Sequence, residues 1–481
     1  MTIEGMNYID GQWVPSSSGA TFTRRNPADH GDVVGVFPDS NSADISAAIS
    51  ALAKAAPQWA ATPPERRGAI LESAAEYLEE RADELIAELV REEGKTRAEA
   101  AMEVSRTPMN LRFYAGEALR TLGSTYPSPG EGLVFTLRQP IGIVGAITPW
   151  NFPLNIPSRK LGPALAAGNV VVFKPSEVTP LMGQRMVEAL LAGGLPAGAI
   201  ALVQGSGRAG AAIAADERVD AVTFTGSTEV GRAIHASVGP TRRSQLEMGG
   251  KNPVVVLEDA DVDKAAALIV KGAFGLTGQA CTGTSRVIAV DTVHDWLLDR
   301  VVELAGEITV GSGGDAGVGM GPLATSQQRD KFLDYVRIGR EEGAELICGG
   351  EPLGAGDGFF VQPTVFAGGS PDMRIVTEEV FGPLVVFQRA ASFDEAVALA
   401  NDSEFGLSAA IVTNDVAKAL AFASRSETGL VKVNQSTTGQ SMNAPFGGHK
   451  SSSTQTHKEQ AGETMMQFYQ SEKTVYLSPS G

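Results

Sequence analysis

IGIVGAITPWNFP, residues 141–153, places a short apolar run directly before a loop rich in proline and aromatic side chains. The run at 141–147 predicts a buried β-strand, because it is short, apolar and bounded by turn-forming residues. In open α/β sheets, the loops that follow the carboxyl ends of strands carry the ligands. The stretch therefore predicts a sheet with a functional loop at its edge.

Alternating strands and helices extend from this stretch through most of the chain. Upstream, residues 65–93 predict one long amphipathic helix that ends at Gly94, since apolar side chains recur there at helical spacing. Because strands that alternate with helices need crossover connections, the pattern predicts mostly parallel sheets in two successive α/β units. The other predicted strands are 170–173, 201–203, 221–224, 253–257, 285–290, 384–387, 409–412 and 430–433, and the other predicted helices are 179–192, 261–275, 292–307, 325–342, 394–401 and 415–426.

The boundaries of these units follow from where the pattern changes. The two units are predicted to join near Gly249 and Gly250. Two isolated β-like stretches, at 133–137 and 473–477, are remote in sequence and could pair in a small extra sheet, a common way to build a subunit contact. We therefore expect one lobe from residues 1–121 and 141–249, a second lobe from residues 250–440, and a bridging β-element from residues 122–140 and 467–481.

Composition narrows the class of protein. The 481 residues carry 39 basic and 56 acidic side chains, a formal net charge of −17, which argues against a nucleic-acid partner. No apolar run reaches the roughly 18 residues of a membrane span, and the N-terminus lacks the features of a signal peptide. The expected protein is cytoplasmic, with no membrane partner.

The few cysteines and the scattered histidines also fit a cytoplasmic protein. Two cysteines, Cys281 and Cys348, cannot build a disulfide framework and fit a reducing compartment. The five histidines are scattered, and none has the spacing of a zinc ligand pair, so no metal site is expected. These histidines are His30, His235, His294, His449 and His457.

Three side chains lie in short motifs that suit carbonyl chemistry. Each of them also has a possible structural role. Asn151, held between prolines and aromatic residues, suits donation of a hydrogen bond to an oxyanion, or simply caps a stiff turn. Cys281 has small neighbours that leave room for attack on a substrate, or is a small buried side chain, as we expect for Cys348. Glu247, between apolar residues, suits a general base, or is a charge at a strand end.

Other strings are compatible with a nucleotide. GSGRAG at 205–210 formally matches the dinucleotide fingerprint, but it is a weak signal in a chain with 55 glycines. FTGSTEVG at 224–231 could place a pyrophosphate near a helix N-terminus. Lys174 and Glu177 end another predicted strand and could hold ribose hydroxyls, or could pair with each other.

Taken together, these strings resemble the NAD(P)-dependent aldehyde dehydrogenase family. The resemblance runs from about residue 8 to residue 475 and keeps the order of the family's motifs. It implies that the first lobe binds NAD, the second is catalytic and the bridging β-element makes a dimer or tetramer. The seven strings are TPWNFP (148–153), KPSE (174–177), FTGST (224–228), EMGGKNP (247–253), GQACTG (278–283), EEVFGP (378–383) and PFGG (445–448).

The resemblance also implies roles for single residues. Cys281 would attack the aldehyde carbon, the amide of Asn151 and the backbone N–H of Cys281 would stabilise the oxyanion, and Glu247 would activate water to release the acid. Lys160 matches a lysine near the site whose role stays open. Coenzyme-A-acylating relatives usually lack the glutamate, so Glu247 favours hydrolysis. Expected cofactor contacts are Thr148, Pro149, Trp150, Lys174, Glu177, Gly207, Gly226, Ser227, Glu379 and Phe381.

The choice of cofactor and substrate rests on fewer residues. A carboxylate at Glu177 accepts both ribose hydroxyls and repels a 2′-phosphate, which favours NAD, although some relatives with this glutamate also use NADP. Arg159 resembles the arginine that grips the distal carboxylate in succinate-semialdehyde and 2-oxoglutarate-semialdehyde dehydrogenases, and Ser441 aligns with another contact there. The ending HKSSSTQTHKEQ, 449–460, departs from the usual family ending and resembles the 2-oxoglutarate-semialdehyde branch.

The sequence leaves two alternatives to a semialdehyde dehydrogenase. If Arg159 is structural and pairs with a nearby carboxylate, the chain is a dehydrogenase for uncharged aliphatic or aromatic aldehydes. A catalytically retired protein that keeps the fold and the dinucleotide is the other alternative. The presence of Asn151, Glu247 and Cys281 together argues against retirement.

Overall fold

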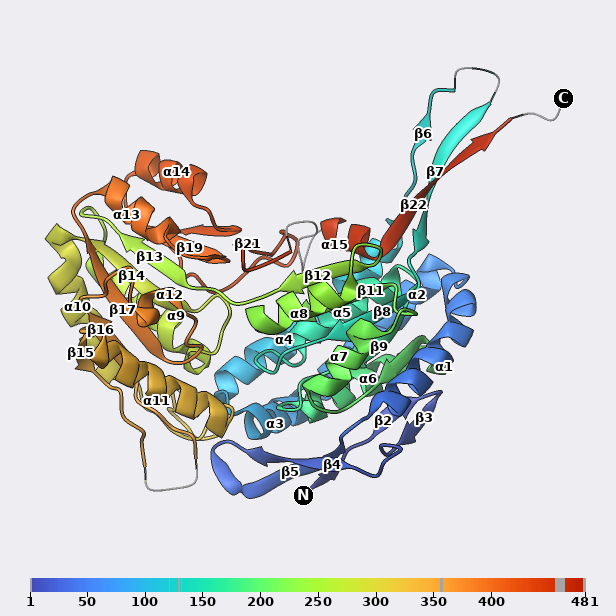
Figure 1. Ribbon diagram of the computed structural model, residues 1–481, viewed down its shortest axis with the longest axis horizontal. Helices are drawn as coiled ribbons and strands as arrows, with labels where there is room; N and C mark the ends of the chain where they lie inside the picture. Colours follow the sequence, from blue (N-terminus) through green and yellow to red (C-terminus); the bar gives the residue numbers. More distant parts are fainter. Residues whose placement is uncertain are drawn as a thin grey trace.

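The computed structural model describes residues 2–120, 122–128, 130, 132–354, 358–454 and 463–478. Two α/β lobes lie side by side, and a narrow β-arm projects away from the first lobe (Figure 1). The predicted two-lobed α/β architecture is therefore confirmed. None of the described helices is long and apolar enough to cross a membrane.

The first lobe is built on a seven-stranded sheet. Its central strands run parallel, and the β2–β3 hairpin joins its edge in the antiparallel sense. β8, β9 and β11 are buried along their whole length, as expected for parallel strands covered by helices on both faces. The strand order is β12 (Arg243–Glu247), β11 (Ala221–Thr225), β8 (Ile143–Ile147), β9 (Val170–Lys174), β10 (Ile200–Leu202), β2 (Asn7–Ile9) and β3 (Gln12–Val14).

The helices of this lobe carry their apolar faces onto the sheet and onto one another. α2 packs against α4, and α4 packs in turn against α5, the helix that follows the TPWNFP loop. The helices are α1 (Ser42–Ala60), α2 (Pro64–Glu80), α3 (Ala82–Glu93), α4 (Arg97–Ala118), α5 (Asn155–Ala166), α6 (Pro180–Ala192), η1 (Ala197–Ala199), α7 (Gly207–Ala215), α8 (Thr228–Val238) and α15 (Glu463–Phe468).

The second lobe repeats the design with another seven-stranded sheet. Only the β15–β16 pair is antiparallel among its described strands. The order is β15 (Glu345–Cys348), β16 (Thr364–Ala367), β17 (Leu384–Ala390), β14 (Thr284–Val290), β13 (Asn252–Val256), β19 (Ser408–Val412) and β20 (Leu430–Val433). Its helices are α9 (Val262–Phe274), η2 (Gly275–Gly278), α10 (Asp291–Gly306), α11 (Ser326–Glu341), α12 (Arg374–Thr377), α13 (Phe393–Asn401) and α14 (Val416–Arg425).

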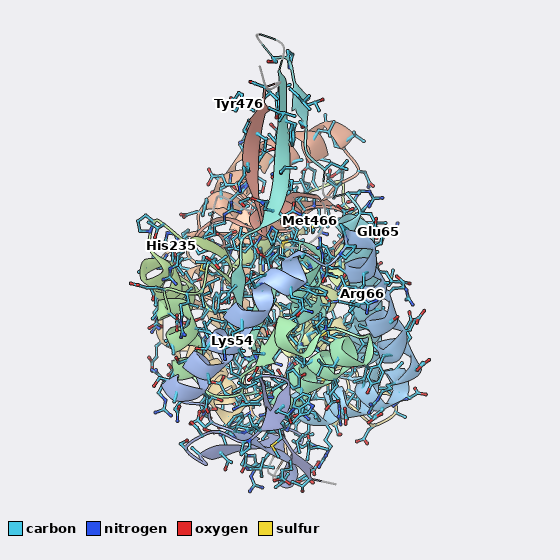
Figure 2. The ribbon with its side chains drawn as sticks, turned by 90° about the vertical axis from the view of Figure 1, so that its right-hand side faces the viewer. Lys54, Glu65, Arg66, His235, Met466 and Tyr476 are labelled. Atoms are coloured by element: carbon cyan, nitrogen blue, oxygen red, sulfur yellow. The ribbon has the colours of Figure 1, made fainter. Side chains whose placement is uncertain are left out.

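The predicted pairing of two remote strands is confirmed in the arm. β22 (Gln470–Leu477) pairs antiparallel with β7 (Leu133–Pro140), so that Leu477 lies opposite Leu133, and β6 (Thr125–Tyr126) adds a third strand. Figure 2 shows Tyr476 far out on this arm and Met466 near its base. Residues 121, 129, 131 and 479–481 of the predicted boundaries, and 455–460 of the unusual ending, lie outside the described residues.

The prediction of one helix over 65–93 is wrong. The chain leaves helical geometry at Arg81 (φ −107°, ψ 16°), which divides the segment into α2 and α3. Between the buried Leu78 and Leu85 no large apolar side chain continues the stripe, so the two halves bury separate faces. The Arg81 guanidinium pairs with Glu84 at 2.7 Å across the break.

Small sheets complete the fold. Near the N-terminus, β5 (Asp29–Pro38) lies between β1 (Ile3–Glu4) and β4 (Thr21–Asn26). β18 (Phe405–Gly406) pairs with β21 (His449–Lys450), which brings the segment after PFGG back onto the second lobe. The sequence pattern predicted none of these pairings, because each strand is too short or too irregular to show a period.

Candidate active site

Cys281 lies in a tight turn between η2 and β14 of the second lobe. The turn is entered through three successive residues with positive φ, Leu276 (+54°), Thr277 (+55°) and Gly278 (+67°). Left-handed backbone is costly for residues with a Cβ, so outside contacts must hold it. The Leu276 N–H donates to the Glu99 carboxylate at 2.6 Å, and the Thr277 hydroxyl donates to the Gly321 carbonyl at 3.1 Å.

Asn252, the first residue of β13, fixes the backbone of Cys281. The Asn252 side-chain amide donates to the Cys281 carbonyl at 2.9 Å and to the Gly283 carbonyl at 2.8 Å. A Cβ on Gly250 would lie 2.7 Å from the same Cys281 carbonyl oxygen, so this close approach needs glycine. Cys281 is partly exposed, and so is Cys348, which the sequence analysis expected to be buried.

Asn151 reaches the cysteine turn from the first lobe. It follows β8 in the TPWNFP loop, and only 3% of it is exposed. Its Nδ2 donates to the Gln279 carbonyl at 2.9 Å, two residues before Cys281. The structure therefore brings the predicted amide and the predicted nucleophile to the same place from different lobes.

Glu247 ends β12 at the same carboxyl edge of the first sheet. It is buried, and its Oε1 accepts a hydrogen bond from the Ser453 hydroxyl at 2.9 Å. Its backbone carbonyl accepts from Gly226 N–H at 3.0 Å, which ties it to the FTGST loop. The Glu247 side chain is thus buried at the end of β12, just before the chain crosses to the second lobe.

The EEVFGP turn closes the other side of the cysteine. Glu379 accepts a hydrogen bond from the Gly250 N–H at 3.0 Å, and burial raises the pKa of this carboxyl. Phe381 has φ +59° and packs edge-on against Trp150 with 5.5 Å between ring centres. A small cavity of about 20 Å³, open to solvent, is lined by residues of both turns, including Gly278, Ala280, Glu379 and Phe381.

Lys251, which the sequence analysis did not single out, lies behind this turn. Its Nζ donates to the Glu378 carbonyl at 2.6 Å. Burial, with the nearby Arg286 cation, lowers the pKa of Lys251 to about 7. Its position in the EMGGKNP motif, directly after the two glycines between the lobes, could have identified it from the sequence.

The other predicted cofactor residues lie at the carboxyl edge of the first sheet. Lys174 ends β9 and pairs with Glu177 at 3.1 Å, the alternative that the sequence had left open, while 45% of the Glu177 side chain stays exposed. Ser227 caps α8 by accepting the Val230 N–H at 3.4 Å, beside Gly226. Gly207 is the exposed first residue of α7. Thr148 is buried, whereas Pro149 and Trp150 are partly exposed.

The two predicted substrate residues have different surroundings. Arg159 lies in α5 and is buried, as is Lys160, whose Nζ donates to the Thr223 hydroxyl at 2.9 Å. Ser441 is exposed and lines a second cavity of about 380 Å³ together with Lys432 and Phe446. Among the described residues, no group of three or more histidine, cysteine or acidic side chains could hold a metal ion.

A buried ion pair beneath the Asn151 loop also escaped the sequence analysis. Lys95 pairs with Glu103 at 2.6 Å, and both side chains are at most 1% exposed. Lysine and glutamate are usually exposed, so a sequence alone gives no reason to expect this pair to be buried. A sequence signal existed in part, because Glu99 and Glu103 are spaced to share one face of a helix.

Comparisons with known proteins find similar sequences and a similar fold over nearly the whole chain. A family model described as the aldehyde dehydrogenase family matches residues 13–475. Alpha-ketoglutaric semialdehyde dehydrogenase of Bacillus subtilis is 41% identical over 480 residues, 98% of each chain. 2,5-dioxopentanoate dehydrogenase of Saccharolobus solfataricus is 43% identical over 470 residues, 97% of this chain and 98% of the relative. The crystal structure of an NAD-dependent aldehyde dehydrogenase from Sinorhizobium meliloti superposes with a TM-score of 0.96 at 34% identity, covering 100% of this chain and 96% of that one.

Proposed function

This chain belongs to the aldehyde dehydrogenase family, and we propose that it oxidises a short semialdehyde with a distal carboxylate to the free acid, using NAD. It is an NAD(P)-dependent aldehyde dehydrogenase. The observation that carries the substrate proposal is the full-length identity of 41% and 43% to relatives named for 2-oxoglutarate semialdehyde, also called 2,5-dioxopentanoate. Succinate semialdehyde, one carbon shorter, is the second expected substrate.

In the proposed mechanism the Cys281 thiolate adds to the aldehyde carbon, and the carbonyl π electrons move onto oxygen. The Asn151 amide and the Cys281 backbone N–H donate to this oxyanion, which is worth about 10²–10³-fold in rate for one such donor. Bound NAD supplies the acceptor for the hydride that leaves this carbon. As the carbonyl reforms, a thioester remains on Cys281. Glu247 then takes a proton from water, which attacks the thioester and expels the thiolate.

The residues at the carboxyl edge of the first sheet fit a dinucleotide. An exposed carboxylate at Glu177 beside the buried Lys174 cation matches a pair of ribose hydroxyls, and it disfavours a 2′-phosphate. The N-terminus of α8, with Gly226 and Ser227, suits a pyrophosphate. Glu379 and Phe381 line a small cavity next to the Cys281 turn, the place at which we propose that the nicotinamide and its ribose bind.

We assign residues 1–121 and 141–249 to NAD binding, residues 250–440 to catalysis, and residues 122–140 and 467–481 to subunit contact. The arm supports the last assignment, because it exposes large apolar side chains to solvent. Leu133, Leu137, Tyr476 and Leu477 are 47%, 43%, 77% and 58% exposed. Exposed apolar surface of this kind marks interaction sites, and a dimer or tetramer would bury it.

Arg159 is the proposed anchor for the distal carboxylate. It lies on α5, the helix that begins directly after the Asn151 loop, and an arginine fork can bind a carboxylate through two hydrogen bonds. Ser441 is proposed as a second contact, at the second cavity. Hydrolysis rather than acyl transfer to a thiol is favoured by Glu247.

The test is initial-rate NADH formation with 2-oxoglutarate semialdehyde, succinate semialdehyde and butyraldehyde, on wild type and on Arg159→Ala. Losing a charge-assisted contact should lower kcat/KM for the two carboxylated aldehydes by roughly 30- to 1000-fold. Butyraldehyde serves as the internal control, because it has no carboxylate to bind. An equal loss on all three substrates would make Arg159 structural and the enzyme a dehydrogenase for uncharged aldehydes. No NADH from any aldehyde, with NAD still bound, would indicate a retired enzyme.

A further inference from the structure

The first two turns of α4 lie at the junction of the two lobes and carry two glutamates, Glu99 and Glu103. Residues four apart on a helix lie on the same face, so the two carboxylates point to one side. One of them contacts the turn that bears the amide, and the other contacts the turn that bears the nucleophile. This helix end therefore touches both halves of the site at once.

Glu103 and Lys95 hold the amide turn. Oε1 of Glu103 accepts the Leu154 and Asn155 N–H groups at 2.9 and 3.1 Å, at the start of α5. The Lys95 ammonium, paired to Glu103 through Oε2 at 2.6 Å, donates to the backbone carbonyl of Asn151 at 2.8 Å. The same ammonium lies 4.9 Å from the Phe152 ring centre. The backbone of Asn151 and the residues that follow it are thus fixed by one buried ion pair.

Glu99 holds the nucleophile turn. Its Oε1 accepts the Leu276 N–H at 2.6 Å, at the first of the three residues with positive φ before Cys281. Its Oε2 accepts the N–H and hydroxyl of Thr96, the residue that caps α4, at 2.9 and 2.8 Å. Glu99 therefore couples the strained turn of the second lobe directly to the helix start in the first.

The second lobe also clamps the chain just before α4. A Cβ on Gly313 would lie 2.1 Å from the Lys95 carbonyl oxygen, and one on Gly321 would lie 2.1 Å from that of Gly94. The Arg97 N–H donates to the Gly313 carbonyl at 2.8 Å. The position of Lys95, and through it of Asn151, is set against the lobe that carries Cys281.

We propose that Lys95, Glu99 and Glu103 are positioning residues that align Asn151 with Cys281 across the lobe junction. The inference rests on the proposed function, since it assigns these residues to the aldehyde-addition step. Removing Lys95 frees the Asn151 carbonyl from a charge-assisted hydrogen bond. Displacement of a reacting group by about 1 Å costs on the order of 100-fold in rate.

The experiment compares Lys95→Met with the double variant Lys95→Met/Glu103→Gln. Lys95→Met leaves two buried carboxylates without their cation, Glu103 and Glu93, which lie 2.6 and 3.9 Å from the ammonium, so it should also lower the thermal unfolding midpoint. The double variant removes the nearer carboxylate as well, while a glutamine oxygen can still accept the Leu154 and Asn155 N–H groups. The double variant should therefore regain part of the lost thermal stability and still oxidise 2-oxoglutarate semialdehyde about 100-fold more slowly in kcat, with the KM for NAD unchanged.

Alkylation of Cys281 by iodoacetamide, followed in a Cys348→Ser background, separates positioning from general damage. Alkylation forms no oxyanion, so its rate should stay at the wild-type level in both Lys95 variants. Glu99→Gln weakens the hold on the cysteine turn itself, so it should change both the alkylation rate and kcat.

The matched control is the ion pair Arg185–Glu88 at 2.6 Å, which joins α6 to α3 away from the site. Arg185→Met and Arg185→Met/Glu88→Gln should change thermal stability with no change in kcat. If Lys95→Met/Glu103→Gln regains kcat together with stability, the pair is merely structural and the inference is overturned. If wild type forms no NADH from any aldehyde, the proposed function fails instead.

Discussion

The two turns that meet at the active site are held by different means. The amide turn around Asn151 is fixed by buried charges, since Lys95 and Glu103 hydrogen-bond its carbonyl and the N–H groups that follow it. The nucleophile turn before Cys281 depends mainly on backbone geometry, with three successive positive φ angles and close contacts that glycine alone allows, and one carboxylate, Glu99, accepts its first N–H at 2.6 Å. The difference shows that one site can combine electrostatic and conformational preorganisation.

Buried charges suit the proposed task of the amide turn, and a tight backbone suits the proposed task of the cysteine turn. An amide that stabilises charge has to point in one direction, and buried hydrogen bonds define direction well. A nucleophile needs exposed space around its sulfur, which a tight turn of small residues provides without covering it.

Cys281→Ala removes the group that forms the covalent bond. NADH formation should fall by about 10⁴-fold or more, because the remaining groups cannot replace a nucleophile. NAD binding, measured by calorimetry, should persist, since none of the proposed dinucleotide contacts is removed. NADH formation at more than one hundredth of the wild-type rate would mean that Cys281 is not the nucleophile.

Asn151→Ala removes the donor on the opposite turn. The expected loss in kcat is about 10²–10³-fold, with iodoacetamide alkylation of Cys281 unchanged. Asn110→Ala is the matched control, because Asn110 is equally buried in α4 and donates to the Ser158 hydroxyl at 2.9 Å. That variant should lose about 1 kcal/mol of stability and keep its kcat. A kcat for Asn151→Ala within a factor of three of wild type would remove the amide from the mechanism.

Gly278→Ala strains the nucleophile turn without touching its chemistry. The new Cβ would meet the Gly382 carbonyl at 2.2 Å, at a residue whose φ is already +67°. A shift of the turn should lower kcat about 100-fold, and urea unfolding should show a loss of at least about 2 kcal/mol. Gly317→Ala has positive φ and no neighbour within 4 Å, so it should cost only about 1 kcal/mol and leave kcat intact. Equal effects from both glycines would show that the close contact is unimportant.

Lys251→Met tests the buried lysine behind the EEVFGP turn. The pKa of Lys251 falls from 10.5 to about 7 on folding, so between these pH values the unfolded chain binds a proton that the folded chain does not. The unfolding free energy of wild type, relative to the variant, should therefore rise with pH from about 7 to about 10.5, by at most about 1.4 kcal/mol per pH unit. Urea unfolding at pH 7, 8, 9 and 10 measures this slope. A flat difference for Lys251→Met would mean that the lysine keeps its ordinary pKa.

Much of the architecture could be predicted from local pattern. Short apolar runs bounded by turns identified β8, β9, β11, β13 and β14 to within one or two residues, because strands buried on both faces need apolar side chains throughout. The helix break at Arg81 was missed because the spacing of Leu78 and Leu85 is compatible with one continuous helix, although no large apolar side chain lies between them. The remote strands β7 and β22 could be named as candidates, but their register is a property of the folded arm.

The sequence by itself determined the family and the order of its motifs, and it singled out Asn151, Glu247 and Cys281 as the proposed reactive residues, because they stand in short motifs that local chemistry and resemblance can identify. Only the tertiary structure decided what supports them. Lys95 and Asn151 are 56 residues apart, and Glu99 reaches Leu276 across 177 residues. The spacing of apolar residues indicates which positions are buried, but not which distant residue each position contacts. Buried charges between distant segments are therefore visible only once the chain has folded.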